Sequence, residues 1–232
     1  MVFGGLQKNS FVDFPGKISC VLFLAGCNFK CPFCHNPELV KRDWRLSYFN
    51  EQAVYHFLER RKGFLDGVVI SGGEPTIYKG LIDLCKEIKK IGYPVKLDTN
   101  GSRPKMLKRL IDEGYVDYIA MDVKTDPFHY FPLITTDPHP DKIISSIDII
   151  MESTITYEFR TTCARPFVDV HTIGKIANII EGAMLYVLQP FHNTKVLQPE
   201  FFSKINPGYG DAELVCLQLI AEPWVKKCSI RV

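Results

Sequence analysis

Short apolar runs alternate with stretches of helical periodicity along most of the chain. The apolar runs are rich in β-branched residues and have the length of buried strands. They cover residues 18–25, 67–71, 95–98, 118–121, 155–162 and 184–188. Between them, apolar residues recur at helical spacing over residues 50–62, 81–91, 104–113, 142–152 and 168–181. The pattern therefore predicts strands that alternate with helices.

Several of the predicted helices have marked ends. Asn50 is a good N-cap for the first helix, and Pro104 suits the first turn of another. Gly92, Gly114 and Gly182 each follow a helical stretch directly, where glycine commonly ends a helix.

Strands that alternate with helices form parallel sheets through right-handed crossovers, which leaves an open doubly wound sheet or a barrel. In both folds, ligands bind at the carboxyl ends of the strands. Polar clusters follow four consecutive predicted strands, at residues 27–35, 71–76, 98–102 and 122–125. Polar clusters at the carboxyl ends of four consecutive strands favour a barrel-like α/β fold.

No repeat or Gly/Ser-rich linker divides the sequence, so we expect a single domain over residues 1–232. Its core is expected at about residues 17–195. Beyond that, prolines separate short pieces, and one apolar helical run covers residues 212–220. We interpret residues from about 196 to 232 as a C-terminal appendage packed on the core.

Composition narrows the class of protein. Apolar residues make up 46% of the 232 positions and charged residues 23%, which excludes a disordered, collagen-like or coiled-coil chain. The formal net charge of +2 gives no field that would favour nucleic acid or anionic lipid. The longest apolar run, residues 20–27, is far shorter than the roughly 20 residues of a membrane span. We therefore expect a cytoplasmic protein with no nucleic-acid or membrane partner.

Three of the eight cysteines lie close together. Cys27, Cys31 and Cys34 form a CxxxCxxC motif in the segment GCNFKCPFCHNP. Three thiolates on one tight loop can converge on a metal centre, and cysteine is the usual protein ligand of iron–sulfur clusters. If no fourth protein ligand joins them, one iron keeps an open position for an exogenous ligand, which would make the centre catalytic.

Two other interpretations of this loop stay open at this point. Zinc could be bound by the three cysteines and His35, although adjacent Cys34 and His35 are awkwardly placed for one tetrahedral ion. The thiols could also be close together incidentally. The isolated cysteines at positions 20, 85, 163, 216 and 228 receive no function, because free cysteine usually behaves as a small buried hydrophobe.

The cysteine loop, with an aromatic residue before its third cysteine, resembles the signature of radical S-adenosylmethionine (SAM) enzymes. The segments 5–40, VVISGGEP (68–75), KLDTNG (96–101) and MDVK (121–124) are similar to the activating enzymes of glycyl radical proteins. Within that group, EFRTT (158–162) and YVLQ (186–189) most resemble the activating proteins of anaerobic ribonucleoside-triphosphate reductase. The resemblance covers roughly residues 4–195 and implies a partial (β/α)6 TIM-like barrel of parallel strands.

The resemblance also implies roles for individual residues. Cys27, Cys31 and Cys34 would hold a 4Fe–4S cluster, which is the catalytic centre. Gly72, Gly73 and Glu74 would receive the amino group of SAM through their backbone, although two glycines after a strand are also an ordinary turn.

Further cofactor-binding roles fall on four side chains. Asp98 would hold the methionyl amine of SAM, Lys124 its carboxylate, and Asp122 with His192 the ribose hydroxyls. A lone histidine in a loop is also often merely structural, and a pair of aspartates is often a solvated surface pair. A monovalent cation bound by Asp98, Thr99, Asp122 and a backbone carbonyl is a further implication.

The activity implied is the reductive cleavage of SAM to a 5′-deoxyadenosyl radical, which generates a glycyl radical on a partner enzyme. The expected partners are a glycyl radical enzyme, namely anaerobic ribonucleotide reductase, and a flavodoxin- or ferredoxin-type reductant. Two alternatives remain: a radical SAM enzyme acting on a small molecule, such as a 7-carboxy-7-deazaguanine synthase-like protein, and a non-catalytic metal-binding module.

Two charged residues complete the sequence-based expectations. Arg160 lies inside an apolar strand, where an unpaired charge is costly, so it should find an acidic partner or a ligand carboxylate. Lys30 lies inside the cysteine loop, where it could raise the potential of a cluster or simply face water.

Overall fold

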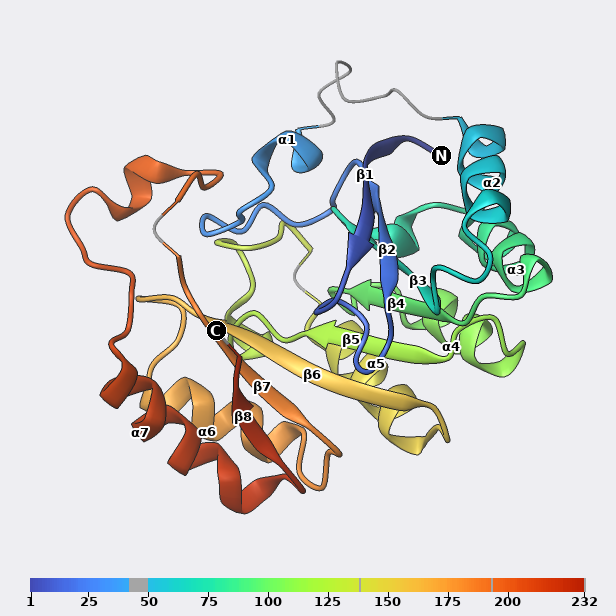
Figure 1. The fold of residues 1–232 in the computed structure, drawn as a ribbon. Coiled ribbons are helices and arrows are strands. Elements are labelled where there is room, and N and C mark those ends of the chain that lie inside the picture. The colour runs from blue at the N-terminus through green and yellow to red at the C-terminus, as the bar shows by residue number, and fades with distance from the viewer. Residues whose placement is uncertain (42–49, 138, 193, 232) are drawn as a thin grey trace. The chain divides into compact units, whose positions relative to one another are not determined.

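The computed structural model describes residues 1–41, 50–137, 139–192 and 194–231 (Figure 1). The strands are β1 (Phe3–Ser10), β2 (Ser19–Leu24), β3 (Gly67–Gly72), β4 (Val95–Thr99), β5 (Tyr118–Asp122), β6 (Thr156–Cys163), β7 (Tyr186–Pro190) and β8 (Cys228–Ile230). The α-helices are α1 (Pro37–Val40), α2 (Glu51–Arg60), α3 (Leu81–Ile91), α4 (Pro104–Asp112), α5 (Asp141–Glu152), α6 (Val170–Ile179) and α7 (Asp211–Ala221). Short 3-10 helices cover Pro75–Ile77, Pro127–His129, Pro199–Phe202 and Glu222–Trp224.

The eight strands form one sheet in which they follow one another in sequence order from β1 to β8. β1 pairs antiparallel with β2, whereas β2–β3, β3–β4, β6–β7 and β7–β8 pair in parallel. Because β1 and β8 end the order, the sheet is not closed into a complete barrel. The predicted α/β class, a partial (β/α)6 TIM-like barrel of parallel strands, is confirmed, and the six predicted strands correspond to β2–β7.

The chain divides into two compact units. The first comprises Met1–Asn28, Glu38–Thr99 and Lys105–Ile119. Its central strands β2 and β3 are apolar almost throughout, and their side chains between Cys20 and Leu22 and between Val68 and Ile70 are at most 1% exposed. Such continuous apolar strands are typical of parallel sheets covered on both faces. Figure 1 shows α2 and α3 side by side in this unit.

The second unit comprises Phe29–Pro37, Asn100–Pro104 and Ala120–Val232. In its part of the sheet, Tyr186 of β7 lies between Phe159 of β6 and Cys228 of β8 in register. The helices α6 and α7 contact each other, and α7 also contacts β7 and β8. The segment after residue 196 therefore contributes a helix and a strand to this unit.

The helix ends follow the sequence signals. The Asn50 side-chain oxygen accepts a hydrogen bond from the backbone N–H of Ala53 at 2.8 Å, which confirms the predicted N-cap. Gly92 ends α3 with a φ of +108°, a conformation that side chains with a Cβ rarely adopt. In the part of the chain that the structure describes, no helix has the length and apolar character needed to cross a membrane.

Candidate functional site

The CxxxCxxC motif runs from one unit into the other. Cys27 belongs to the first unit, and Cys31 and Cys34 belong to the second. All eight cysteines lie within the described residues, and none of them forms a disulfide. Cys31 is buried, whereas Cys27 and Cys34 are partly exposed.

In the first unit, the Gly72–Gly73 turn docks directly on the start of the cysteine loop. The backbone N–H of Gly73 donates to the carbonyl oxygen of Leu24 at 2.8 Å, and that of Glu74 donates to Gly26 at 2.9 Å. A Cβ on Gly73 would lie 2.1 Å from the Gly26 oxygen and 3.2 Å from the Cys27 nitrogen. This glycine is therefore required by the approach of the chain's own backbone, next to Cys27.

The Glu74 carboxylate is fully buried and ties this turn to the end of β4. Its Oε1 accepts hydrogen bonds from the backbone N–H and hydroxyl of Thr76, at 3.0 and 2.5 Å, and from the Thr99 hydroxyl at 2.8 Å. The predicted cofactor-binding segment 72–74 is thus held in place by a buried carboxylate.

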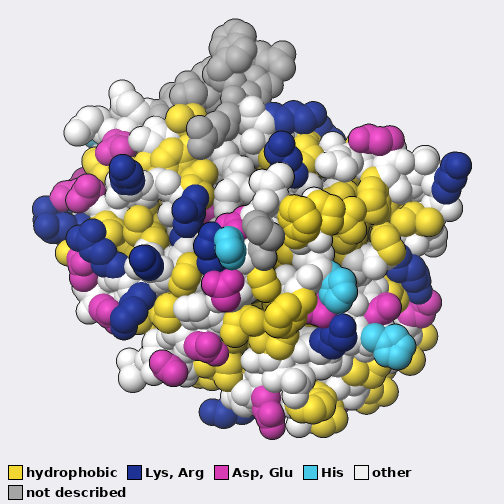
Figure 2. Space-filling model, turned by 180° about the vertical axis from the view of Figure 1, so that it is seen from behind, with side chains coloured by type: hydrophobic (Ala, Val, Ile, Leu, Met, Phe, Trp, Pro, Cys, Tyr) yellow, Lys and Arg dark blue, Asp and Glu magenta, His cyan; other side chains and the backbone are white. Residues whose placement is uncertain are grey.

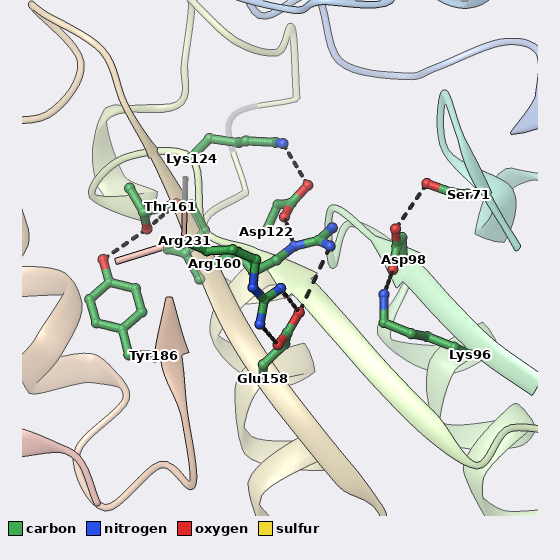
Figure 3. A network of polar contacts seen from close by, with 11 residues as sticks. Ser71, Lys96, Asp98, Asp122, Lys124, Glu158, Arg160, Thr161, Tyr186 and Arg231 are labelled. Carbon is green, nitrogen blue, oxygen red and sulfur yellow. Dashed lines mark hydrogen bonds and ion pairs between the residues drawn. The ribbon is translucent and has the colours of Figure 1, made fainter. Parts of the chain in front are cut away.

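Asp98, at the end of β4, lies in a second polar cluster of the first unit (Figure 3). Its Oδ1 forms an ion pair with Lys96 Nζ at 2.5 Å, and its Oδ2 accepts from the Ser71 hydroxyl at 3.0 Å. Lys96 is 1% exposed, so this ammonium group depends on Asp98 for compensation. Ser71 and Asp98 bring the ends of β3 and β4 together, as the sequence predicts.

In the second unit, backbone hydrogen bonds hold the cysteine loop. The N–H of Cys34 donates to the Cys31 carbonyl at 3.0 Å and closes a tight turn. Lys30 N–H donates to Ile134 at 2.8 Å, and Leu197 N–H donates to Cys34 at 3.0 Å. The loop is therefore fixed from two segments that lie far away in the sequence.

Two buried phenylalanines anchor the same loop. Phe29 packs edge-on against Tyr130 with ring centroids 5.6 Å apart, and Phe33 packs against Phe167 at 5.0 Å. Both are 3% exposed. The aromatic residue before the third cysteine is thus a structural anchor of the loop.

Asp122 and Lys124 follow β5 and form an ion pair in which Lys124 Nζ lies 2.8 Å from Asp122 Oδ2 (Figure 3). Arg160 of β6 donates from Nε to Asp122 Oδ1 at 2.7 Å. The predicted acidic partner of Arg160 is therefore confirmed as Asp122.

Electrostatics favour the charged forms of this pair. Burial acts to raise the pKa of Asp122, but Arg160 and Lys124 outweigh it and hold that pKa well below its usual range. Burial acts to lower the pKa of Lys124, but Asp122 and the Cys31 thiol outweigh it, so that the pKa is raised. Lys124 thus stays cationic and interacts electrostatically with two cysteines of the motif, Cys31 and Cys34.

His192 is exposed, and its backbone carbonyl lies 2.9 Å from the Nε2 atom of His35. The His35 ring stacks on Phe191 with centroids 5.3 Å apart. The histidine of the zinc alternative therefore has its Nε2 atom engaged by backbone. Among the described residues, no group of His, Cys, Asp and Glu is arranged around a position for a single metal ion.

The isolated cysteines differ from one another. Four of them are buried, and burial raises the pKa of Cys20, Cys85 and Cys163 to about 12 and that of Cys228 to about 11. Cys216 is exposed, so the expectation of a buried hydrophobe is wrong for this residue. It lies on a face of α7 where Val215 and Leu219 are also exposed.

The residues of the motif fit an iron–sulfur cluster in donor chemistry. The three cysteines follow one another on a loop with fixed backbone and form no disulfide, and the cationic Lys124 interacts electrostatically with Cys31 and Cys34. In such a cluster each thiolate binds its own iron, so the thiols need not surround a single ion.

Comparisons with known proteins identify the family of this chain. Residues 21–180 match the radical SAM superfamily. This chain belongs to that superfamily. Members use a 4Fe–4S cluster and SAM, so the chain is a radical SAM enzyme and these are its cofactors.

Individual relatives support a narrower similarity. A protein of Methanocaldococcus jannaschii named as a glycyl-radical enzyme activating enzyme is 34% identical over 98% of this chain and 94% of its own length. The pyruvate formate-lyase-activating enzyme of Clostridium pasteurianum is 30% identical over 51% of this chain and 50% of its own. Among solved structures, SuiB of Streptococcus suis matches 91% of this chain and 48% of its own, with a TM-score of 0.65 and 16% identity, which shows a shared fold.

An apolar segment of this radical SAM protein lies on the surface of the second unit. Phe128, Phe131 and Leu133, between β5 and α5, are 65%, 54% and 50% exposed. Beside them, Leu133 helps to line a cavity of about 320 Å³ together with His129, His171 and Lys175. Figure 2 shows one face of the molecule on which hydrophobic side chains gather in patches between charged and histidine side chains.

Sequence reasoning missed two charged residues of the polar network, Glu158 and Arg231. Glu158 of β6 is fully buried, and both of its carboxylate oxygens are bound by Arg231, which follows β8 (Figure 3). The signal for Glu158 was available, because it is a carboxylate inside an apolar strand, as Arg160 is a cation in one. Nothing local marks Arg231.

Proposed function

We propose that this protein activates a glycyl radical enzyme, and that its partner is an anaerobic ribonucleoside-triphosphate reductase. The similarity to a glycyl-radical enzyme activating enzyme over nearly the whole of both chains carries the proposal. The stretches 158–162 and 186–189 support the choice of a reductase as partner.

In this proposal, Cys27, Cys31 and Cys34 would hold the cluster. The bound cluster and SAM would supply a 5′-deoxyadenosyl radical for the removal of a hydrogen atom from a glycine of the partner. A flavodoxin- or ferredoxin-type protein supplies the electron, in an anaerobic cytoplasm.

The side chains of the two polar clusters bind and orient SAM. Lys124 stays cationic because Asp122 raises its pKa, and so it can hold the carboxylate of the methionyl group. Asp98, which is paired with Lys96, accepts from the methionyl amine, and Asp122 with His192 accepts from the ribose hydroxyls. The backbone of residues 72–74 is held in place by the buried Glu74 carboxylate and by hydrogen bonds to the carbonyl oxygens of Leu24 and Gly26.

The exposed side chains Phe128, Phe131 and Leu133 support a protein substrate. Exposed apolar groups of this size commonly mark protein interaction sites.

Anaerobic reconstitution with iron and sulfide, followed by addition of a reductant, SAM and a candidate reductase, tests the proposal. We expect about four irons per chain, formation of 5′-deoxyadenosine, and a glycyl radical signal in paramagnetic resonance on the reductase. A protein that forms 5′-deoxyadenosine only with a small molecule, and no glycyl radical on any glycyl radical enzyme, would contradict it.

A further inference from the structure

Glu158 and Arg231 form a paired, forked contact in the second unit. Arg231 donates from Nη1 to Glu158 Oε1 at 2.9 Å and from Nη2 to Oε2 at 2.6 Å. The Glu158 side chain is 0% exposed, whereas that of Arg231 is 36% exposed. Two parallel charge-assisted hydrogen bonds of this kind are the strongest way for an arginine to hold a carboxylate.

Arg160 lies between this pair and two of the proposed SAM-binding residues, Asp122 and Lys124 (Figure 3). Its Nε donates to Asp122 Oδ1 at 2.7 Å, while its Nη1 lies 3.9 Å from Glu158 Oε1. Asp122 in turn holds Lys124 at 2.8 Å. Charges of alternating sign therefore run from Arg231 through Glu158, Arg160 and Asp122 to Lys124.

Arg160 makes a short contact with the Asp122 carboxylate and a longer one with the Glu158 carboxylate. Glu158 is satisfied by Arg231, so it has little to gain from drawing Arg160 closer. Without Arg231, the buried Glu158 carboxylate would lose both hydrogen bonds of the fork, which is costly, and the Arg160 cation already lies 3.9 Å from it. The 3.9 Å separation would then shorten at the expense of the 2.7 Å contact with Asp122.

We infer that Arg231 is a positioning residue of the SAM site. By neutralising Glu158, it leaves Arg160 to orient Asp122, and Asp122 to orient Lys124. The strand β8 thus has a function in ligand binding, because it brings Arg231 to Glu158. This inference rests on the proposed roles of Asp122 and Lys124 in holding SAM.

The test compares the binding of SAM by reconstituted variants. Arg231→Met keeps the apolar stem and removes the fork, and we expect its SAM dissociation constant to rise about tenfold, as is typical when a ligand's supporting partner is lost. Glu158→Gln removes the competing charge, and so both Glu158→Gln and the double variant Glu158→Gln/Arg231→Met should stay within about twofold of the wild type. The change that SAM causes in the paramagnetic resonance spectrum of the reduced cluster should be lost in parallel with affinity.

Arg165→Met is a matched control. Arg165 holds Glu213 at 2.6 Å with its side chain 35% exposed, so its removal breaks a pair of the same length and arginine exposure. We expect this variant to bind SAM like the wild type.

Each other outcome counts against the inference. Unchanged SAM affinity in Arg231→Met would overturn it, as would a double variant that stays weak, because Arg231 would then act by another route. Loss of SAM affinity in Glu158→Gln would show that the intact network, and not the neutralisation of Glu158, supports SAM binding. This variant keeps the test decisive if Arg231→Met does not fold. A wild-type protein that holds the full cluster yet binds no SAM would overturn the proposed function itself.

Discussion

The carbonyl oxygen of Gly26 accepts a hydrogen bond from the backbone N–H of Glu74 at 2.9 Å. This bond joins the residue before the first cysteine of the motif to the turn that follows β3. The next residue back, Gly73, lies so close to Gly26 that only a glycine fits. Two motifs far apart in the sequence are therefore one structural element.

A Gly73→Ala variant should lose much of its capacity to bind iron. The added Cβ would lie 2.1 Å from the Gly26 oxygen and 2.6 Å from its carbonyl carbon, so backbone next to Cys27 must move. Overpacking of this kind costs roughly 1–3 kcal/mol. We expect the iron content after anaerobic reconstitution to fall below about half of the wild-type value.

Gly80→Ala is the control for this variant. Gly80 precedes α3 with a φ of −78°, and the nearest atom to an added Cβ is 3.9 Å away. It should take up iron like the wild type. Full iron content in Gly73→Ala would show that the close contact does not position Cys27.

Phe33→Ala should destabilise the second unit and its part of the cysteine loop. The ring is 3% exposed and packs on Phe167, and removing a buried phenylalanine costs about 3–5 kcal/mol. Urea unfolding followed by circular dichroism measures the loss. The same substitution at Phe128, which is 65% exposed, should change stability by at most about 0.5 kcal/mol. Equal effects of the two substitutions would contradict the anchoring role of Phe33.

The buried Asp126 carboxylate should make the free energy of unfolding depend on pH. The carboxylate is 6% exposed, and burial acts to raise its pKa, but hydrogen bonds from Lys175 and the Phe128 backbone outweigh burial and lower it. A pKa below the unfolded value of about 3.9 means that the ionised group stabilises the fold above that pH. This contribution is lost as the pH falls through the folded-state pKa.

Asp126→Asn should therefore lower the free energy of unfolding at pH 7 by about 1 kcal/mol. This is less than the usual contribution of a buried hydrogen bond to a charged group, because the Lys175 side chain is largely exposed to solvent. The difference from the wild type should shrink below about pH 4. Urea unfolding of the metal-free protein at pH 7 and below about pH 4 measures this difference in stability. Asp148→Asn is the control, because Asp148 is exposed. A difference that is constant with pH would contradict the assignment.

The sequence predicted the parts of this fold that have a local pattern. Strands β2–β7 are apolar runs because they are buried, and the cysteine spacing marks a loop by itself. The edge strand β1 was missed because its sequence, FGGLQKNS, is glycine-rich and polar, and only its end residues Phe3 and Ser10 are buried. The strand β8 has only three residues, which is too short for any periodicity.

Contacts between distant residues were beyond sequence reasoning. Arg231 and Glu158 are 73 positions apart, and only the parallel pairing of β8 with β7 brings them together. The acidic partner of Arg160 was expected on energetic grounds, but its identity as Asp122 follows from the fold. Likewise, the glycine pair at 72–73 predicted a close approach without showing that the chain itself occupies the space.

The exposed Cys216 should react with an alkylating agent faster than the buried cysteines. Cys216 is on the surface of α7, while Cys20, Cys85 and Cys163 are buried with pKa values raised to about 12. Alkylation requires both access and the thiolate form, and at pH 8 the buried thiols have neither. In the cluster-loaded protein, where the motif cysteines are ligands, iodoacetamide should therefore modify Cys216 first, by more than about tenfold in rate. Peptide mass spectrometry after a short reaction measures this ratio, and Cys216→Ser should abolish the fast phase. Rapid labelling of Cys85 in the folded protein would contradict the packing of α3.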